Sequence, residues 1–263
     1  MSWLEKFSLA GKKALIHGAD CPRGEEIAAG LCEAGAQVWL CGADPEALAQ
    51  ATRRLADSGC TAAGSFVYEP GTEAAAIDLM ANVRRDMRRL DIFIDNASCR
   101  LPAGWDHDFA AIDQVFKRTQ LGLILTVKQA GLLMVEQESG SVIFITDYTA
   151  LVGCDVHLYA GEPEKFNEDF SLLTGFVKGS YVNYARQAAG FLGEHQVRCN
   201  CIAFAPTEGT VPAGFADAFI RHTHLKRLAR ATDVKSAVVF LASDASAYIT
   251  GITLPVDGGY TAK

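Results

Sequence analysis

The order of apolar and amphipathic segments constrains this chain most. Seven short apolar runs are typical of buried strands, and longer amphipathic segments between them are typical of helices. The expected strands cover residues 12–19, 36–42, 62–68, 90–97, 139–147, 196–204 and 251–259. The expected helices cover residues 23–34, 45–58, 72–89, 109–137, 171–194 and 232–243. This alternation predicts a parallel sheet that is covered by helices on both faces.

The predicted fold is a single α/β domain over residues 1–263, a three-layer, doubly wound Rossmann fold with a seven-stranded parallel sheet. We find no linker, internal repeat or composition break that would divide the chain. Residues 152–170, VGCDVHLYAGEPEKFNEDF, fit neither pattern. We expect them to form an insertion beside the pocket that acts either as a lid or as an interface.

Charge and cysteine usage exclude several classes of function. The net charge is −7 without a basic stripe, which argues against nucleic acid and against an anionic membrane as a partner. The first residues do not resemble a signal peptide, and no apolar run is long enough to span a bilayer, so we expect a cytoplasmic protein. The eight cysteines form no CxxC pair. We therefore expect reduced structural thiols and no metal site.

The turn after the first strand, HGADCPRGEEIA, occupies the place of a phosphate-binding loop. Such loops are glycine-rich, because the backbone approaches the pyrophosphate closely and the next helix offers its N–H groups. Gly18 and Gly24 hold two of three plausible glycine positions, but the middle one is Pro22, which lacks an N–H. Glu25 and Glu26 would repel a pyrophosphate. We expect an obstructed pyrophosphate site, or a tight turn that binds nothing.

The second strand ends without a clear cofactor signal. An NAD site requires a carboxylate here and an NADP site an arginine. Gly42 and Ala43 stand at the tip, and Asp44 comes one or two residues late before Pro45. Asp44 is equally suited to cap the next helix. Neither NAD nor NADP is favoured.

Four segments resemble the short-chain dehydrogenase/reductase (SDR) family, especially its sugar-acid and acyl-CoA-type members. SLAGKKALIHGA is similar to the family's opening, which usually ends in Thr-Gly, and DIFIDNAS is similar to its Asn-Asn-Ala-Gly strand. HQVRCNCIA resembles its IRVN-x-I-x-P-G strand, and VVFLASDASAYITGITLPVDGG resembles its C-terminal block. The resemblance covers residues 8–260 and implies a Rossmann fold and NAD(P)-dependent oxidoreduction.

The resemblance also locates four catalytic positions. In the family a Tyr is the acid/base, a Lys lowers its pKa and holds the nicotinamide ribose, a Ser polarises the carbonyl, and an Asn anchors a proton relay. These positions hold Thr174, Lys178, Asp147 and Thr119 here, so that only the lysine is retained. Loss of a positioned acid/base typically costs on the order of 10²–10⁴ in rate. The Asp147 carboxylate would also repel a developing alkoxide.

Further positions of the family's site depart from its pattern. The implied cofactor-binding positions are Gly18, Pro22, Gly24, Gly42, Asn96, Ala97 and Phe204. Phe204-Ala205 replaces a Pro-Gly pair, Asp95 replaces the first Asn of the fourth strand, and Ser98 replaces its last glycine. Tyr159 lies near the usual Ser-to-Tyr spacing. However, Lys165 follows it by six residues rather than four, and Pro163 would break the helix that should carry both.

The leading interpretation is a non-catalytic SDR subunit that binds no cofactor itself and pairs with an active, NAD-binding SDR paralogue, in a hydroxyacyl-CoA or hydroxy-acid dehydrogenase. The pattern is similar to that of two-subunit SDR dehydrogenases with one degenerate subunit, such as that of the benzylsuccinyl-CoA pathway. The alternatives are a divergent active NAD(P)-dependent oxidoreductase, using Lys178, Asp147 and either Tyr148 or Tyr159, and a small-ligand sensor.

Two structural expectations follow from this interpretation. Asp147 and Lys178 should form an ion pair, because a buried ammonium that has lost its companion needs a partner. The two long helices, 109–137 and 171–194, should carry an assembly surface for a heterotetramer. Its expected apolar positions include Leu121, Leu125, Ala185 and Ala189.

Overall fold

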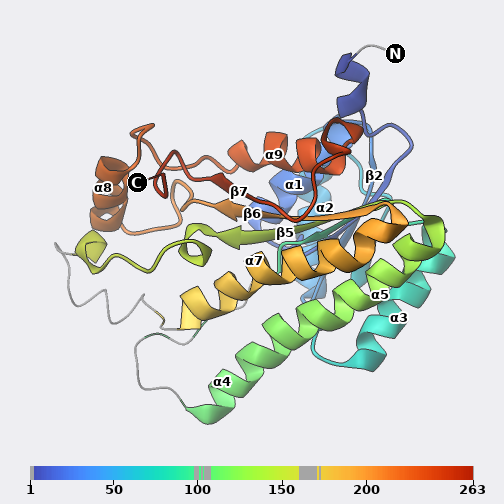
Figure 1. The fold of residues 1–263 in the computed structure, drawn as a ribbon, viewed down its shortest axis with the longest axis horizontal. Coiled ribbons are helices and arrows are strands. Elements are labelled where there is room, and N and C mark those ends of the chain that lie inside the picture. Colours follow the sequence, from blue (N-terminus) through green and yellow to red (C-terminus); the bar gives the residue numbers. More distant parts are fainter. Residues whose placement is uncertain are drawn as a thin grey trace.

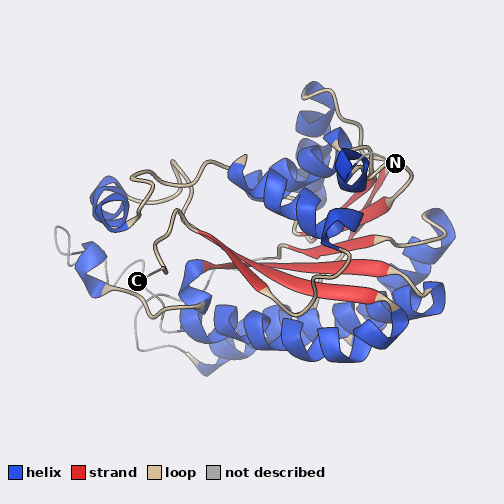
Figure 2. Cartoon of the chain, turned by 45° about the horizontal axis from the view of Figure 1, so that its top comes forward, coloured by secondary structure: helices blue, strands red, loops and turns tan. Residues whose placement is uncertain are grey.

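A seven-stranded parallel sheet forms the centre of the computed structural model, which describes residues 3–97, 101, 103, 108–159, 171 and 173–262 (Figure 2). The strands are β1 Lys13–His17, β2 Gln37–Gly42, β3 Gly64–Val67, β4 Ile92–Asp95, β5 Gly140–Asp147, β6 Val197–Phe204 and β7 Thr253–Val256. Their order in the sheet is β3-β2-β1-β4-β5-β6-β7, and every neighbouring pair is parallel. The predicted fold and all seven predicted strands are confirmed.

Helices cover both faces of this sheet (Figure 1). The helices of the described residues are α1 Pro22–Glu33, α2 Pro45–Asp57, α3 Glu73–Asp86, α4 Phe109–Phe116, α5 Gly122–Gln137, α7 Leu173–Leu192, α8 Ala213–His222 and α9 Asp233–Ala242. One layer contains α1, α2 and α9, and the other contains α3, α5 and α7. Only α8 was not expected from the sequence. None of the described helices is long and apolar enough to cross a membrane.

Two apolar cores lie on opposite faces of the sheet. Successive strand residues point to opposite faces, so each central strand contributes to both cores. Ile94 and Ile145 pack in the core beneath α1 and α9, whereas Phe93 and Phe144 pack in the core beneath α3, α5 and α7. This two-sided burial explains why the strands are continuous apolar runs in the sequence.

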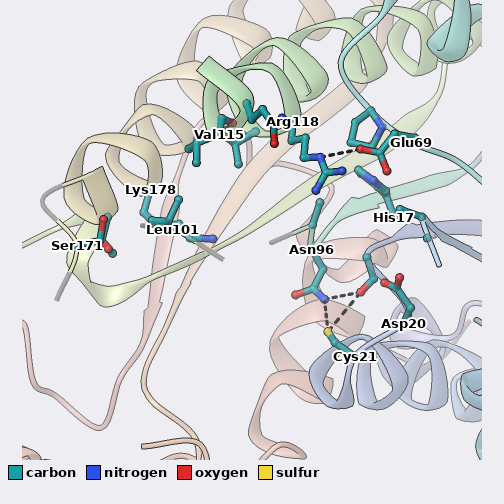
Figure 3. Close-up of a pocket in the computed structure, with 18 of the residues that line it drawn as sticks. His17, Asp20, Cys21, Glu69, Asn96, Leu101, Val115, Arg118, Ser171 and Lys178 are labelled. Atoms are coloured by element: carbon teal, nitrogen blue, oxygen red, sulfur yellow. Dashed lines mark hydrogen bonds and ion pairs between the residues drawn. The ribbon is translucent and has the colours of Figure 1, made fainter. Parts of the chain in front are cut away.

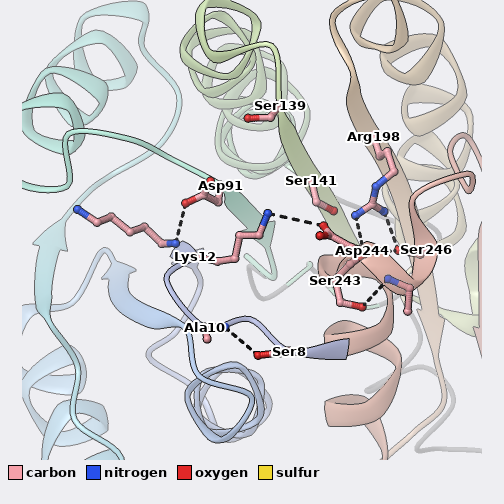
Figure 4. Close-up of polar contacts among 12 residues, drawn as sticks. Ser8, Ala10, Lys12, Asp91, Ser139, Ser141, Arg198, Ser243, Asp244 and Ser246 are labelled. Atoms are coloured by element: carbon pink, nitrogen blue, oxygen red, sulfur yellow. Dashed lines mark hydrogen bonds and ion pairs between the residues drawn. The ribbon is translucent and has the colours of Figure 1, made fainter. Parts of the chain in front are cut away.

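Polar contacts tie together the amino ends of the strands, at the edge opposite the carboxyl ends (Figure 4). Arg198 Nη1 donates to the carbonyl oxygen of Leu241 at 2.7 Å and to Ser246 Oγ at 2.8 Å. Ser141 Oγ donates to the same carbonyl at 2.8 Å, and the N–H of Lys13 donates to an Asp91 carboxylate oxygen at 2.9 Å. These bonds join β1, β4, β5, β6 and α9 at the amino ends of the strands.

The predicted 109–137 helix is divided by a π-helical turn at Lys117–Leu121, between α4 and α5. Such turns are frequent at functional sites, and this one carries Thr119. Of the expected insertion at 152–170, Val156–Tyr159 forms a short 3₁₀ helix, and residues 160–170 lie outside the described residues. Its function as a lid or an interface stays a prediction.

Candidate functional site

A cavity of about 980 Å³ opens at the carboxyl ends of the central strands (Figure 3). Chain order reverses between β1 and β4, which is where ligands bind in doubly wound sheets. Eight of the predicted site residues line the cavity: Gly18, Gly42, Asn96, Ala97, Thr119, Asp147, Thr174 and Lys178. The structure therefore brings the family's catalytic and cofactor positions together in one place.

Three predicted cofactor positions do not line the cavity. Pro22 is exposed at the first position of α1, Gly24 is buried behind the loop, and Phe204 is fully buried in the core at the end of β6. A Cβ atom on Gly24 would lie 2.3 Å from the Gly18 carbonyl oxygen. Gly18 itself has a φ of +75°. Both glycines are therefore required by the tight turn itself, whether or not it binds a ligand.

Thr174 and Lys178 lie one helical turn apart on α7 and face the cavity. The Lys178 ammonium lies 5.7 Å from the centre of the Tyr181 ring. The backbone of Lys178 is tied to the sheet, because Thr146 Oγ1 donates to its carbonyl oxygen at 3.0 Å. The lysine expected from the resemblance is thus in position, with a threonine where its phenolic partner would be.

Asp147 ends β5 and caps the short 3₁₀ helix Tyr148–Ala150. Its Oδ1 accepts hydrogen bonds from the N–H of Thr149, at 2.9 Å, and from the hydroxyl of the same residue. The predicted Asp147–Lys178 ion pair is wrong: it is not among the ion pairs of the part of the chain that the structure describes. The Asp147 carboxylate instead bonds the backbone and hydroxyl of Thr149 two residues on, as aspartates in turns commonly do.

Thr119 does not offer its hydroxyl proton freely to the cavity. Its Oγ1 donates to the Val115 carbonyl oxygen at 2.6 Å, which is a common fate of threonine inside helices. The neighbouring residue, Gln120, links the π-helical turn to α7. Its Nε2 donates to the Val177 carbonyl oxygen and to Ser180 Oγ, both at 3.3 Å. Thr119 is therefore a structural element of the π-helical turn.

No tyrosine of the described residues lines the cavity. Tyr148 packs edge-on against Phe219 and Tyr260, and burial raises its pKa well above the ordinary range. Tyr159 packs against Phe215. A raised pKa is the opposite of what a phenolic acid/base requires. Ser98, Pro163 and Lys165 lie outside the described residues.

Sequence reasoning missed a buried pair at the floor of the cavity. His17 Nδ1 lies 2.9 Å from Asp95 Oδ2, and the two residues are 4% and 1% exposed. His17 stands where the family resemblance has Thr, and Asp95 stands where it has Asn. The two departures from the family pattern are therefore in direct contact, through His17 Nδ1 and Asp95 Oδ2.

Arg23, at the start of α1, was also missed. Its Nε donates to Asn96 Oδ1 at 2.8 Å, and Asn96 Nδ2 donates to the Gly18 carbonyl oxygen at 2.8 Å. Burial lowers the pKa of the Arg23 guanidinium, and the nearby Cys21 and Asp147 only partly oppose this. A cation therefore lies where the ends of β1, β4 and β5 meet.

The charges beside the loop are compensated. Glu25 pairs with Arg54 at 2.5 Å, and Glu26 pairs with Lys235 at 3.1 Å. These pairs weaken the repulsion that we expected for a pyrophosphate, so Pro22 is the remaining reason for obstruction. The obstruction itself stays a prediction. Asp44 accepts hydrogen bonds from Glu46 and Ala47 N–H groups, which confirms that it can act as the cap of α2.

Comparison with known proteins identifies the family. The chain matches the family model described as enoyl-(acyl carrier protein) reductase over residues 23–261. It is 30% identical to gluconate 5-dehydrogenase of Gluconobacter oxydans (strain 621H), over 99% of both chains. The chain belongs to the SDR family. An SDR relative named 2-dehydro-3-deoxy-D-gluconate 5-dehydrogenase, of Pseudoalteromonas atlantica, is 29% identical over 99% of this chain and 100% of its own.

Solved SDR structures share the whole fold. A gluconate 5-dehydrogenase from Burkholderia cenocepacia J2315, in complex with NADP and tartrate, has a TM-score of 0.87 at 23% identity, with 100% of each chain covered. An SDR from Mycobacterium marinum has a TM-score of 0.86 at 24% identity, again with 100% of each chain covered. The fold of these SDR structures is therefore shared over the full length of this chain.

The cavity fits an SDR dinucleotide only in part. The tight turn at Gly18 and Gly24 is retained, and the space beside Gly42 at the end of β2 holds the Asp20 carboxylate. In contrast, Arg23 Nε donates to Asn96 Oδ1 just beyond the end of β4. An Arg118–Glu69 ion pair of 2.8 Å lies across one wall of the cavity (Figure 3). We therefore derive no hydride-transfer step for this site.

Proposed function

We propose that this chain is a non-catalytic SDR subunit that pairs with an active NAD-dependent paralogue, in a complex that interconverts an alcohol and a ketone on a hydroxyacyl-CoA or hydroxy acid. One observation carries the proposal. The cavity presents Lys178 and Thr174 at the expected positions, but no phenol from the described residues. A threonine hydroxyl cannot be tuned to the range of a phenol by a neighbouring ammonium.

Electrostatics at the carbonyl position support the same proposal. SDR enzymes place a neutral hydroxyl where Asp147 stands in this chain. A carboxylate there would raise the energy of a developing alkoxide instead of stabilising it.

An exposed apolar surface supports pairing with another chain. Leu121 at the end of the π-helical turn, Ile124 and Leu132 of α5, and Phe176 and Phe191 of α7 are 40–69% exposed. Leu121, Ile124 and Leu132 share one stripe of this helical segment, and α5 and α7 cover the same face of the sheet (Figure 1). Exposed apolar patches of this kind commonly mark protein interfaces.

The structure corrects part of the predicted surface. Ala185 and Ala189 are buried inside the chain, against the sheet, and are unable to contact a partner. Leu125 is half-buried, and Leu121 is exposed as expected. The apolar contacts on α7 would therefore be made by its phenylalanines. We propose a heterotetramer because closed two-fold assembly covers such a stripe on every subunit.

The test is to purify the chain alone, and together with an SDR homologue encoded beside it. We expect the isolated chain to show no NAD(P)-dependent turnover of hydroxy acids or hydroxyacyl-CoA esters, and to co-purify with the homologue. Turnover by the isolated chain would replace this proposal with the divergent-enzyme alternative. That alternative is favoured by the retained Lys178 and by the dehydrogenase names of the relatives.

A further inference from the structure

Two cysteines meet where α1 packs against the segment that follows α2. Cys60 is 4% exposed, and its Sγ donates to the carbonyl oxygen of Ala29 in α1 at 3.8 Å. Cys32 lies one turn further along α1 and is partly buried against the core cluster that contains Cys60. A helical side chain leans back over the preceding turn, so the Cys32 side chain covers the turn at Ala29. Both thiols therefore lie at the same place on α1.

The end of α2 fixes the backbone that carries Cys60. The N–H of Cys60 donates to the Leu55 carbonyl oxygen at 3.1 Å. The preceding residue, Gly59, has the left-handed φ of +86° that commonly follows the end of a helix. The backbone of Cys60 is therefore held against α1 by local hydrogen bonding, before any covalent bond forms.

The two thiols interact in the reduced chain and differ in their access to solvent. Burial first, and then the interaction with the Cys32 thiol, raise the pKa of Cys60 to about 11, whereas the charges of Glu33 and Lys235 act on it in opposite directions. Cys60 is therefore protonated at neutral pH, and the more exposed Cys32 is the thiol that an oxidant reaches first. An accessible thiol beside a second, resolving thiol is the arrangement found in redox-sensitive pairs.

We propose that Cys32 and Cys60 form a reversible disulfide when the folded chain meets hydrogen peroxide. The Cys32 thiolate attacks one peroxide oxygen, the O–O bond breaks, and the products are Cys32 sulfenic acid and a hydroxide that takes up the thiol proton. The Cys60 sulfur then attacks the Cys32 sulfur, the S–O bond breaks, and the hydroxyl group leaves with the Cys60 proton as water. One peroxide is reduced to two waters, and two thiols are oxidised to one disulfide.

The bond would tie α1 to the connection between α2 and β3. It would close a ring that contains all of β2 and α2. A cross-link of this kind restricts the unfolded chain, so the oxidised form should be more stable than the reduced form. The inference goes beyond the proposed function, because it requires neither a partner subunit nor a ligand in the cavity.

The test is to treat the folded full chain with a few equivalents of hydrogen peroxide, alkylate the remaining thiols and digest the protein without reduction. Trypsin combined with a glutamate-specific protease separates Cys32 from Cys41, because Glu33 lies between them. Mass spectrometry should find the Cys32 peptide joined to the Cys60 peptide as the main cross-link. Calorimetry should show a melting temperature about 5 °C higher after oxidation. Dithiothreitol should reverse both changes.

Variants assign the roles of the two thiols. Cys32→Ser should abolish the cross-link and leave Cys60 reduced, whereas Cys60→Ser should leave Cys32 as a sulfenic acid that dimedone labels. The matched control is Cys154→Ser, which should leave the cross-link unchanged. It removes another partly exposed thiol, and burial raises the pKa of that thiol to about 11 as well. Circular dichroism establishes that each variant is folded.

Three results would overturn the inference. They are the absence of the Cys32–Cys60 peptide after peroxide treatment, a cross-link that forms only after unfolding in urea, and a cross-linked chain that melts no higher than the reduced chain. None of these readouts measures turnover or assembly. Failure to form the disulfide would therefore end this inference and leave the non-catalytic assignment untouched.

Discussion

Asp95→Ala is expected to destabilise the chain by about 3–5 kcal/mol, the usual result of removing one member of a buried charged or hydrogen-bonded pair. The substitution leaves His17 Nδ1 without its acceptor 2.9 Å away, in a place where both residues are almost completely buried. It also opens a small hole between β1 and β4. Equilibrium unfolding in urea measures the loss as a lower midpoint at an unchanged slope.

A double substitution tests whether the two residues compensate each other. His17→Thr with Asp95→Asn restores the residue types that the family resemblance places at these positions, and we expect it to recover most of the lost stability. The matched control is Asp86→Ala, which removes an exposed carboxylate from a pair with Arg85 and should barely move the midpoint. A small effect of Asp95→Ala would show that the pair is not coupled. So would a double variant whose loss of stability equals the sum of the losses in His17→Thr and Asp95→Asn measured separately.

Ile124→Glu is expected to abolish co-purification with the homologous subunit. Ile124 lies in the exposed stripe of α5, 46% exposed in the isolated chain. In an assembled interface the new carboxylate would be buried without a partner, which costs several kcal/mol, or at least about a hundredfold in affinity. Size-exclusion chromatography with light scattering would show the complex separating into smaller species.

The matched control is Val67→Glu. Val67 is 63% exposed on β3, one of the two edge strands of the sheet. In the strand order, β3 lies far from β5 and β6, the strands that α5 and α7 contact. It adds the same charge and should leave the complex intact. If Ile124→Glu also leaves the complex intact, the assembly surface lies elsewhere, and the pairing proposal loses its structural basis.

The sequence predicts the centre of the sheet well, because β1, β2, β4, β5 and β6 are buried on both faces and are therefore nearly continuous apolar runs. It predicts the positions of Thr174 and Lys178 equally well, because both lie on one helix at a fixed spacing. The helix α8, Ala213–His222, was missed, although Phe215 and Phe219 are both buried and lie one turn apart. That spacing was the signal that could have identified it.

Contacts between distant segments were beyond the sequence. His17 and Asp95 are 78 residues apart, and only the parallel pairing of β1 with β4 makes them neighbours. Arg23 is ordinary at the start of a helix until Asn96 is placed beside it. Asp147 was assigned to Lys178 because both are catalytic positions, but a backbone N–H two residues away competes more effectively. The departures at His17 and Asp95 from the family pattern are in direct contact, so part of the change at this site couples two positions that are distant in the sequence.

The most direct test of the non-catalytic assignment is turnover by the co-purified complex when Lys178 of this chain alone is replaced by alanine. We predict a rate within about twofold of the unmodified complex, because in the proposed complex the partner subunit carries out the reaction, and we expect the same substitution at the equivalent lysine of the partner to remove activity. A fall of about 10²–10⁴ on replacing Lys178 here would contradict the account, since a loss of that size is typical of a working acid/base site.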